Sequence, residues 1–253
     1  MTSLTTVLKK ETSVKKLILI SMASFALSLT VYAKDEHSKP VTAPPADAHT
    51  AHHDSVEGMA PEKAMGLLKT GNAHFIKEEF RKDGASKADV QRLSGAQHPH
   101  TIVLSCSDSR VPPEVVFDQK LGEIFVIRTA GEALEPIAIG SIEYAVEHLG
   151  VKNIVVMGHT QCGAVKAALS TLDGKDAGSP NLNKLVADIH PRLQSFAKKP
   201  ASENFSSEGW ANSKGVAKDL LGRSELLAKA VKAGKLKVSS ALYNLHSGIV
   251  DFE

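Results

Sequence analysis

The chain has little cysteine and almost no net charge, and each shortage excludes a class of protein. Only two cysteines occur among 253 residues, which is too few for a disulfide-rich scaffold. The 30 Lys and Arg residues nearly balance the 28 Asp and Glu residues, so the sequence lacks the basic excess of a nucleic-acid-binding protein. A composition that is 42% hydrophobic and 23% charged argues against wholesale disorder and against a fibrous repeat, and it indicates a globular protein.

Residues 1–33 have the pattern of a secretory signal peptide. Four lysines precede an uncharged run over residues 17–33, which ends in Val31-Tyr32-Ala33 before Lys34. This order of basic region, apolar region and small-residue cleavage site predicts a periplasmic or secreted protein. The alternative is an uncleaved membrane anchor, but the run lies at the short end of the ~17–25 residues that a spanning helix needs. We therefore expect cleavage, with no stable membrane span afterwards.

Residues 34–58 have the composition of a disordered linker, with three prolines, several alanines and no apolar periodicity. The linker holds four of the eleven histidines, at positions 37, 49, 52 and 53. We interpret them as part of a solvated tether, with metal capture as the alternative. A single folded domain is predicted over residues 59–253. Without the four Lys and one Glu of the leader, the formal net charge falls from +2 to about −1.

The body of the chain has the pattern of one α/β domain with a central, mostly parallel sheet flanked by helices and an N-terminal helical extension. Its strand-like segments are short, continuous apolar runs, as expected for buried parallel strands. We expect strands over residues 101–105, 123–127 and 153–157, and a C-terminal pair over 236–245 and 249–252. We expect helices over residues 60–80, 136–149, 161–172, 184–197 and 209–233, with a polar loop over 173–183.

Two short motifs directly follow predicted strands. Cys106-x-Asp108-x-Arg110 follows the first strand, and His159-x-x-Cys162 follows the third strand and opens a helix. Because sites in open α/β sheets form beyond the carboxyl ends of the strands, the two motifs converge if the strands are neighbours. The spacing of His159 and Cys162 would let the first turn of a helix present both side chains to one point. The helix N-terminus would favour a thiolate at Cys162.

The two cysteines admit two interpretations. In an exported protein, a Cys106–Cys162 disulfide is the default expectation. The alternative is a Cys₂His metal site with His159, which in catalytic zinc sites leaves a fourth position for water or substrate. Asp108 and Arg110 suit the surroundings of such a site, since a carboxylate can accept a hydrogen bond there or fill the open position while an arginine holds it. The coincidence of these residues at two strand ends favours the metal site.

The combined pattern resembles the β-class carbonic anhydrases over roughly residues 60–252. The resemblance begins with Cys106-x-Asp108-x-Arg110 and His159-x-x-Cys162-Gly163-Ala164. It extends to Gly71-Asn72-x-x-Phe75, Ser109-Arg110-Val111-Pro112-Pro113-Glu114, Phe117-Asp118, Ile127-Arg128-x-Ala130-Gly131, Gly140-Ser141-Ile142-Glu143-Tyr144-Ala145 and Val155-Val156-Met157-Gly158-His159. The whole set is highly specific, whereas either short motif alone is not.

The resemblance implies a zinc enzyme, a carbonate dehydratase that hydrates CO₂ reversibly to bicarbonate and a proton by attack of zinc-bound hydroxide. It implies one Zn²⁺ per subunit and a homodimer or homotetramer. The implied zinc ligands are Cys106, His159 and Cys162. The implied catalytic pair is Asp108 and Arg110, unless Asp108 is a fourth ligand in an inactive state. Gly163 and Ala164 are implied to lie close to the substrate pocket.

One position departs from the family pattern. Many members have Arg-Asn-Ala-Gly-Asn, where this chain has Arg128-Thr129-Ala130-Gly131-Glu132. The carboxylate of Glu132 changes local hydrogen bonding but not the ligand set. Residues 74, 148 and 132 are all candidates for the proton shuttle, although surface exposure without such a role is the simpler interpretation of each. Two other functions remain open: hydrolysis of a CO₂ analogue such as CS₂ or COS, and non-catalytic zinc binding.

Overall fold

The computed structural model describes residues 58–253, which form one compact unit. The predicted signal peptide, and the predicted linker except for its last residue, lie outside the described residues. Within residues 58–253, every helix is too short or too polar to cross a bilayer.

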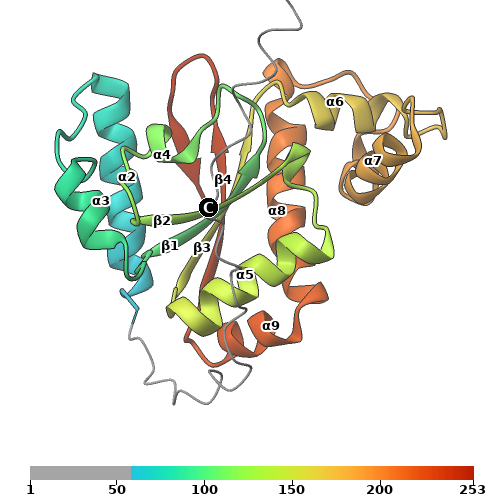
Figure 1. Cartoon of the computed structure of the whole chain (residues 1–253). Coiled ribbons are helices and arrows are strands. Elements are labelled where there is room, and N and C mark those ends of the chain that lie inside the picture. Colours follow the sequence, from blue (N-terminus) through green and yellow to red (C-terminus); the bar gives the residue numbers. More distant parts are fainter. Residues whose placement is uncertain (1–57) are drawn as a thin grey trace, which may run out of the picture. The chain divides into compact units, whose positions relative to one another are not determined.

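A five-stranded sheet forms the centre of the domain, in the order β2-β1-β3-β4-β5 (Figure 1). Its strands are β1 (Thr101–Cys106), β2 (Ile124–Thr129), β3 (Asn153–His159), β4 (Lys237–Tyr243) and β5 (Val250–Phe252). The first four strands in this order are parallel, and β5 runs antiparallel to β4. The side chains of β1 and β3 are buried throughout, which accounts for their continuous apolar runs. The predicted mostly parallel sheet is confirmed.

One face of the sheet packs against α5 (Pro136–Leu149), α8 (Ser206–Arg223) and α9 (Glu225–Lys232) (Figure 1). Ile102 and Leu104 of β1 point into this core together with Ile154 and Val156 of β3. Because side chains alternate along a strand, the residues between them point to the opposite face.

The opposite face packs against α2 (Pro61–Lys77) and α4 (Pro113–Val116), with α3 (Lys87–Leu93) further out. Val103 of β1 and Val155 of β3 contribute to this second core. Asn72 of α2 joins the N-terminal helix to the C-terminal hairpin. Its side chain donates to the carbonyl of Gly248 at 2.9 Å and accepts from the N–H of Val250 at 2.9 Å.

A third core lies beyond the carboxyl ends of the strands and involves α6 (Gly163–Ser170) and α7 (Pro180–Leu193). Cys106 and Cys162 belong to it, packed with Val165, Val186 and Ile189. Three short 3₁₀ turns connect this region: η2 (Ala130–Glu132), η3 (Gln194–Phe196) and η4 (Glu203–Phe205). The edge of the sheet that carries the predicted motifs is therefore covered by protein and partly shielded from water.

The predicted helices and strands are present, but one predicted helix is divided, one predicted loop is shorter, and two short helices were not predicted. The predicted helix over residues 209–233 is two helices, because Ser224 leaves the helical conformation and its hydroxyl caps α9 by accepting from Leu227 N. The predicted loop over residues 173–183 is shorter, since Ser179 caps α7 and Pro180 occupies its first turn. Sequence periodicity missed α3 and α4, which have only seven and four residues.

Candidate metal centre

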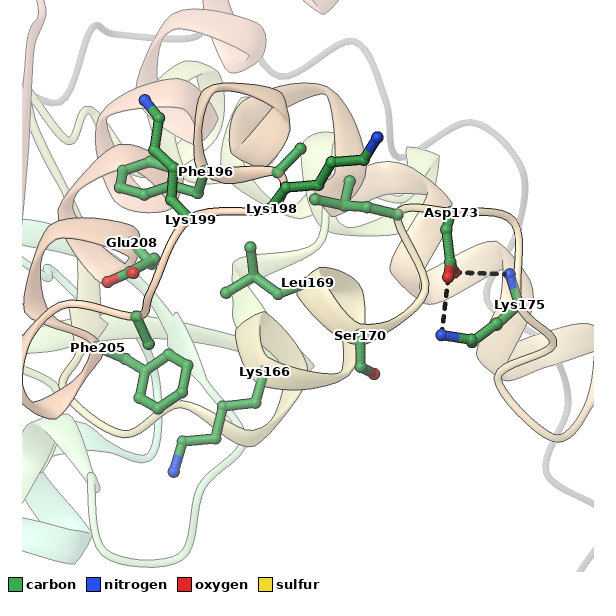
Figure 2. Close-up of a pocket in the computed structure, with 13 residues that line it drawn as sticks. Lys166, Leu169, Ser170, Asp173, Lys175, Phe196, Lys198, Lys199, Phe205 and Glu208 are labelled. Carbon is green, nitrogen blue, oxygen red and sulfur yellow. Dashed lines mark hydrogen bonds and ion pairs between the residues drawn. The ribbon is translucent and has the colours of Figure 1, made fainter.

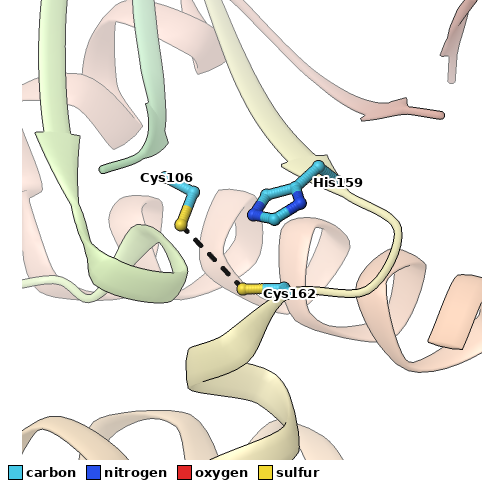
Figure 3. A group of neighbouring side chains, drawn as sticks. All are labelled: Cys106, His159 and Cys162. Carbon is cyan, nitrogen blue, oxygen red and sulfur yellow. Dashed lines mark hydrogen bonds between the residues drawn. The ribbon is translucent and has the colours of Figure 1, made fainter. Parts of the chain in front are cut away.

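Three side chains converge at the carboxyl ends of two neighbouring strands (Figure 3). Cys106 is the last residue of β1, His159 is the last residue of β3, and Cys162 directly precedes α6. Since β1 and β3 pair in parallel, their final residues lie at the same edge of the sheet. One donor atom from each of the three buried residues lies within 4.8 Å of the other two. The predicted convergence of the two motifs is confirmed.

His159 and Cys162 do not share a helical turn, contrary to the prediction. The chain leaves β3 at His159, turns at Gln161 with a left-handed φ of 61°, and begins α6 only after Cys162. The turn is held by the backbone N–H of Gln161, which donates to Asn204 O at 2.8 Å. A strand end and a helix start, joined by two residues, bring the side chains together. Cys162 is the N-cap residue of α6, so the prediction that it lies at a helix N-terminus is confirmed.

The imidazole of His159 is oriented as a metal ligand. Its Nδ1 lies 2.8 Å from Thr160 O, and because a carbonyl only accepts, Nδ1 carries the proton. Nε2 is therefore left with a lone pair. It is buried and has no hydrogen-bond partner among the described residues. An unsatisfied buried acceptor between two thiols fits a metal ion, which would use this lone pair.

The two sulfur atoms lie 3.9 Å apart, and both cysteines are free thiols in this structure. Two thiolates on one tetrahedral zinc, each about 2.3 Å from the metal, are separated by about 3.8 Å, whereas a disulfide bond is about 2.0 Å long. The contact with Cys162 lowers the pKa of Cys106, helped by His159 and the N–H of Gly131. The same contact and burial raise the pKa of Cys162. A dication between the sulfurs would allow both to ionise.

Asp108 lies beside the cluster and is held by Arg110. The Arg110 guanidinium donates from Nε to Oδ1 at 2.9 Å and from Nη2 to Oδ2 at 2.7 Å. This pairing lowers the pKa of Asp108 well below its usual range. Asp108 Oδ2 is also 3.8 Å from His159 Nε2. The carboxylate is thus ionised, fixed in orientation and close to the free lone pair of His159.

Arg128 donates hydrogen bonds to the backbone carbonyls of Cys106 and Asp108. The two short motifs in the sequence did not indicate this contact. Arg128 Nε donates to Cys106 O at 3.0 Å, and its Nη2 donates to Asp108 O at 2.6 Å. The side chain starts on β2, which is paired with β1, so it reaches across one strand spacing. The only sequence signal for Arg128 was its place in the family pattern.

The two residues expected near a substrate pocket lie in the first turn of α6. Gly163 is exposed, and a Cβ at its position would meet no atom of the described residues within 4 Å beyond its chain neighbours and its own helix. Ala164 is partly buried and packs with the core that contains both cysteines. Open space therefore adjoins Cys162 on the side of Gly163.

The three shuttle candidates differ in exposure. Glu132 is only 1% exposed, so it cannot exchange a proton directly with buffer. His74 is bonded to the buried Asp118 at 3.1 Å. His148 is exposed on α5, where its ring lies 5.0 Å from that of Tyr144. Glu132 is thereby removed as a direct shuttle.

A separate hollow of about 550 Å³ lies along the outer side of α6 and does not include the three clustered residues (Figure 2). Its lining combines apolar side chains, among them Leu169, Phe196 and Phe205, with several lysines. Lys166 lies over the ring of Phe205, with its Nζ 4.7 Å from the ring centroid. The hollow begins one helical turn after Cys162 and is distinct from the cluster.

Known proteins are similar to this chain in sequence and in fold. A family model described as carbonic anhydrase matches residues 101–250. A carbonic anhydrase of Mycolicibacterium smegmatis is 38% identical over 191 residues, which cover 76% of this chain and 92% of that protein. The β-carbonic anhydrase CafA of Aspergillus fumigatus superposes with a TM-score of 0.58 at 25% identity, covering 76% of this chain and 89% of that one. A tetrameric β-carbonic anhydrase of Sordaria macrospora shares the fold with a TM-score of 0.58 at 23% identity, covering 76% and 91%. This chain therefore belongs to the carbonic anhydrase family, in its β class.

Proposed function

We propose that this enzyme binds one Zn²⁺ per subunit through Cys106, His159 and Cys162 and hydrates CO₂ reversibly to bicarbonate and a proton. The observation that carries the proposal is the buried, unpartnered Nε2 of His159, which faces two thiols whose separation matches two ligands of one tetrahedral zinc. When bound there, zinc supplies a Lewis acid that lowers the pKa of water toward neutrality.

Asp108 and Arg110 form the catalytic pair of the proposed site. The fixed, ionised carboxylate of Asp108 can accept a proton-bearing hydrogen bond at the open side of the cluster. Both oxygens of Asp108 accept from Arg110, which supports the paired arrangement of the two residues. Arg110 acts on the reaction by holding that orientation.

The space beside Gly163 is the proposed entry for the substrate. CO₂ is small and apolar, and a glycine at this position leaves room next to Cys162. Ala164, the next residue, packs against the core that contains both cysteines. A larger side chain at either position would compete with the substrate.

The proposed assembly is a homodimer or homotetramer. The tetrameric relative in Sordaria macrospora supports it, as does the edge strand β2, which is paired on one side only. The apolar residues 124–127 of β2 are half-buried in the single chain, and Ile137 on the adjoining α5 is 82% exposed. Sedimentation velocity should give twice or four times the subunit mass.

We also propose that residues 1–33 direct export and are removed, which places the enzyme in the periplasm or outside the cell. The support is the sequence pattern alone, from the four lysines to Ala33. N-terminal sequencing of the exported protein should begin at Lys34. Retention of the full-length chain in the membrane fraction would contradict this proposal.

The function is tested by metal analysis and CO₂ hydration kinetics on purified protein. We expect one zinc per subunit and hydration activity in the unmodified chain. Cys106→Ser should lose both, whereas Asp108→Ala should keep zinc and lose about 100-fold or more in kcat/KM. The matched control is Asp173→Ala, which removes an exposed aspartate paired with Lys175 at 2.7 Å and should change neither.

A Cys106–Cys162 disulfide in zinc-free protein from the native source would overturn the proposed function. Undiminished hydration by Asp108→Ala would overturn the catalytic role proposed for Asp108. Assays with COS and CS₂ belong beside the CO₂ assay, because faster turnover of either analogue would assign the same ligands to a different substrate.

A further inference from the structure

The turn behind Cys106 has an unusual backbone and a buried polar contact to the cluster. Gly131 and Glu132 in η2 both have left-handed φ angles, 62° and 54°, and such a conformation is uncommon for glutamate. The N–H of Gly131 donates to Cys106 Sγ at 3.4 Å.

The side chain of Asn212, from the middle of α8, fixes this turn. Its Nδ2 donates to Gly131 O at 2.8 Å and to Glu132 Oε2 at 2.8 Å. Asn212 is fully buried and Glu132 is 1% exposed, so water does not compete for these bonds. Both hydrogens of one amide group are therefore directed at two consecutive residues of the turn.

The orientation of Asn212 is set in turn by Arg192 of α7. Arg192 Nη1 lies 3.4 Å from Asn212 Oδ1, which directs the NH₂ group of the asparagine toward the turn. Arg192 is itself held by Asp219 at 2.9 Å and Asp188 at 3.0 Å. A chain of polar contacts thus runs from Asp188 and Asp219 through Arg192 and Asn212 to the turn whose N–H contacts the sulfur of Cys106.

Packing closes the turn from the remaining sides. A Cβ on Gly131 would come within 2.8 Å of Ile189 Cδ1 and 2.9 Å of Ala164 Cβ. Packing therefore fixes where the turn lies, and the hydrogen bonds of Asn212 fix which way its peptide groups face. Burial, together with the charge of Cys106, raises the pKa of Glu132 well above its usual value, which favours an uncharged carboxyl behind the sulfur.

We propose that Asn212 and Glu132 are positioning residues that hold the Gly131 N–H on Cys106 Sγ and thereby set the affinity of the cluster for zinc. This inference rests on the proposed zinc site. Neither residue touches the metal ligands directly, and each acts through the turn between them. Residues that orient metal ligands typically contribute 10–100-fold to metal affinity.

The test is a zinc titration of metal-free protein against a chromophoric chelator, with the absorption spectrum of the Co²⁺ form as a second readout. Asn212→Ala and Glu132→Ala should weaken zinc binding by about 10–100-fold and alter the thiolate-to-cobalt band. Glu132→Gln keeps an oxygen that can accept from Asn212, so it should remain within about threefold of the unmodified chain.

Two matched controls separate positioning from stability. Asn72→Ala removes another buried asparagine with three hydrogen bonds to backbone atoms, remote from Cys106. Glu208→Gln alters another buried glutamate on α8, one that bonds only to Ser202 among the described residues. Both should change the thermal unfolding temperature without changing the zinc affinity.

The inference is overturned if Asn212→Ala binds zinc as tightly as the unmodified chain, or if Asn72→Ala weakens binding equally. If Asn212→Ala fails to fold, equal zinc affinities of Glu132→Ala and Glu132→Gln overturn it instead. These results differ from a failure of the proposed function, in which the unmodified chain itself would bind no zinc.

Discussion

Arg110 holds both carboxylate oxygens of Asp108, at 2.9 Å and 2.7 Å, while one of these oxygens lies 3.8 Å from the free Nε2 of His159. The arginine side chain is 60% exposed, so the ion pair contributes little to folding stability. Its effect is directional, because a planar guanidinium fork fixes the plane of the carboxylate. The pair therefore orients the Asp108 carboxylate at the site and adds little to the stability of the fold.

Replacing Arg110 by lysine should separate charge from geometry. Lysine retains the positive charge but cannot bind both oxygens in one plane. We expect kcat/KM for CO₂ hydration to fall about 10–100-fold, with the zinc content unchanged and little change in folding stability. Arg92→Lys, at an exposed pair with Asp89 at 3.0 Å, is the control and should leave the kinetics unchanged. Full activity of Arg110→Lys would show that charge alone suffices.

Glu132 should make the protein less stable as the pH rises. Burial, and secondarily the charge of Cys106, raise the pKa of Glu132, so the folded state keeps a proton that the unfolded state releases above about pH 4.3. The stabilising contribution of the protonated Glu132 is fully present below that pH. It falls by about 1.4 kcal/mol per pH unit until the folded pKa is reached. Glu132→Gln does not titrate and should gain stability relative to the unmodified chain as the pH rises above about 4.3, measured by urea unfolding of zinc-free protein.

Glu208→Gln should show the opposite dependence and is the control for this measurement. Burial opposes ionisation of Glu208, but hydrogen bonds from Ser202 outweigh it and lower the pKa of the carboxyl. Its stabilising contribution is present above about pH 4.3 and is lost as the pH falls. A stability difference between Glu132→Gln and the unmodified chain that stays constant with pH would refute the Glu132 prediction.

Gly163→Val should obstruct the space beside Cys162. A Cβ fits there without a clash, but the added methyl groups would occupy the proposed substrate entry. We expect kcat/KM to fall about 10-fold or more while the zinc content remains at one per subunit. Gly222→Val on α8, where a Cβ also meets no atom within 4 Å, is the matched control and should leave the kinetics unchanged. Equal kinetics for the two variants would place the substrate elsewhere.

Asn72→Ala should destabilise the domain without affecting chemistry. The substitution removes hydrogen bonds to Val116 O, Gly248 O and Val250 N, and leaves buried backbone groups unpaired. We expect the free energy of unfolding to fall by about 3 kcal/mol in urea titrations. Asn181→Ala, at an exposed position of α7, should change it by less than about 0.5 kcal/mol. A small effect at Asn72 would mean that water satisfies the freed groups.

The strands of the sheet could be predicted well because the residues that mark each strand are consecutive in the sequence. The strands β1 and β3 are buried on both faces, so each is a continuous apolar run ending at a polar motif. Gly150 ends α5 in the left-handed conformation, which a residue without a Cβ adopts easily. The short helices α3 and α4 had no such signal, since seven and four residues hold too few periods to stand out.

The ligand candidates could be read from the sequence, but their arrangement could not. Cys106, His159 and Cys162 were identifiable because two motifs follow two strands. The helical turn predicted to join His159 and Cys162 was wrong, because the left-handed Gln161 ends the strand and delays the helix. A single backbone conformation of that kind leaves little trace in composition or periodicity.

The sequence by itself determined the α/β class, the two strand-end motifs, the ligand candidates and the family resemblance, because each depends on residues close together in the chain. Only the tertiary structure decided that Nε2 of His159 is free, that Arg110 takes both oxygens of Asp108, and that Asn212 reaches the turn behind Cys106. Asn212 lies 81 residues from Gly131, and its contact exists because α8 packs across the sheet. Hydrogen bonds depend on distance and direction in space, and these are set by packing between distant segments.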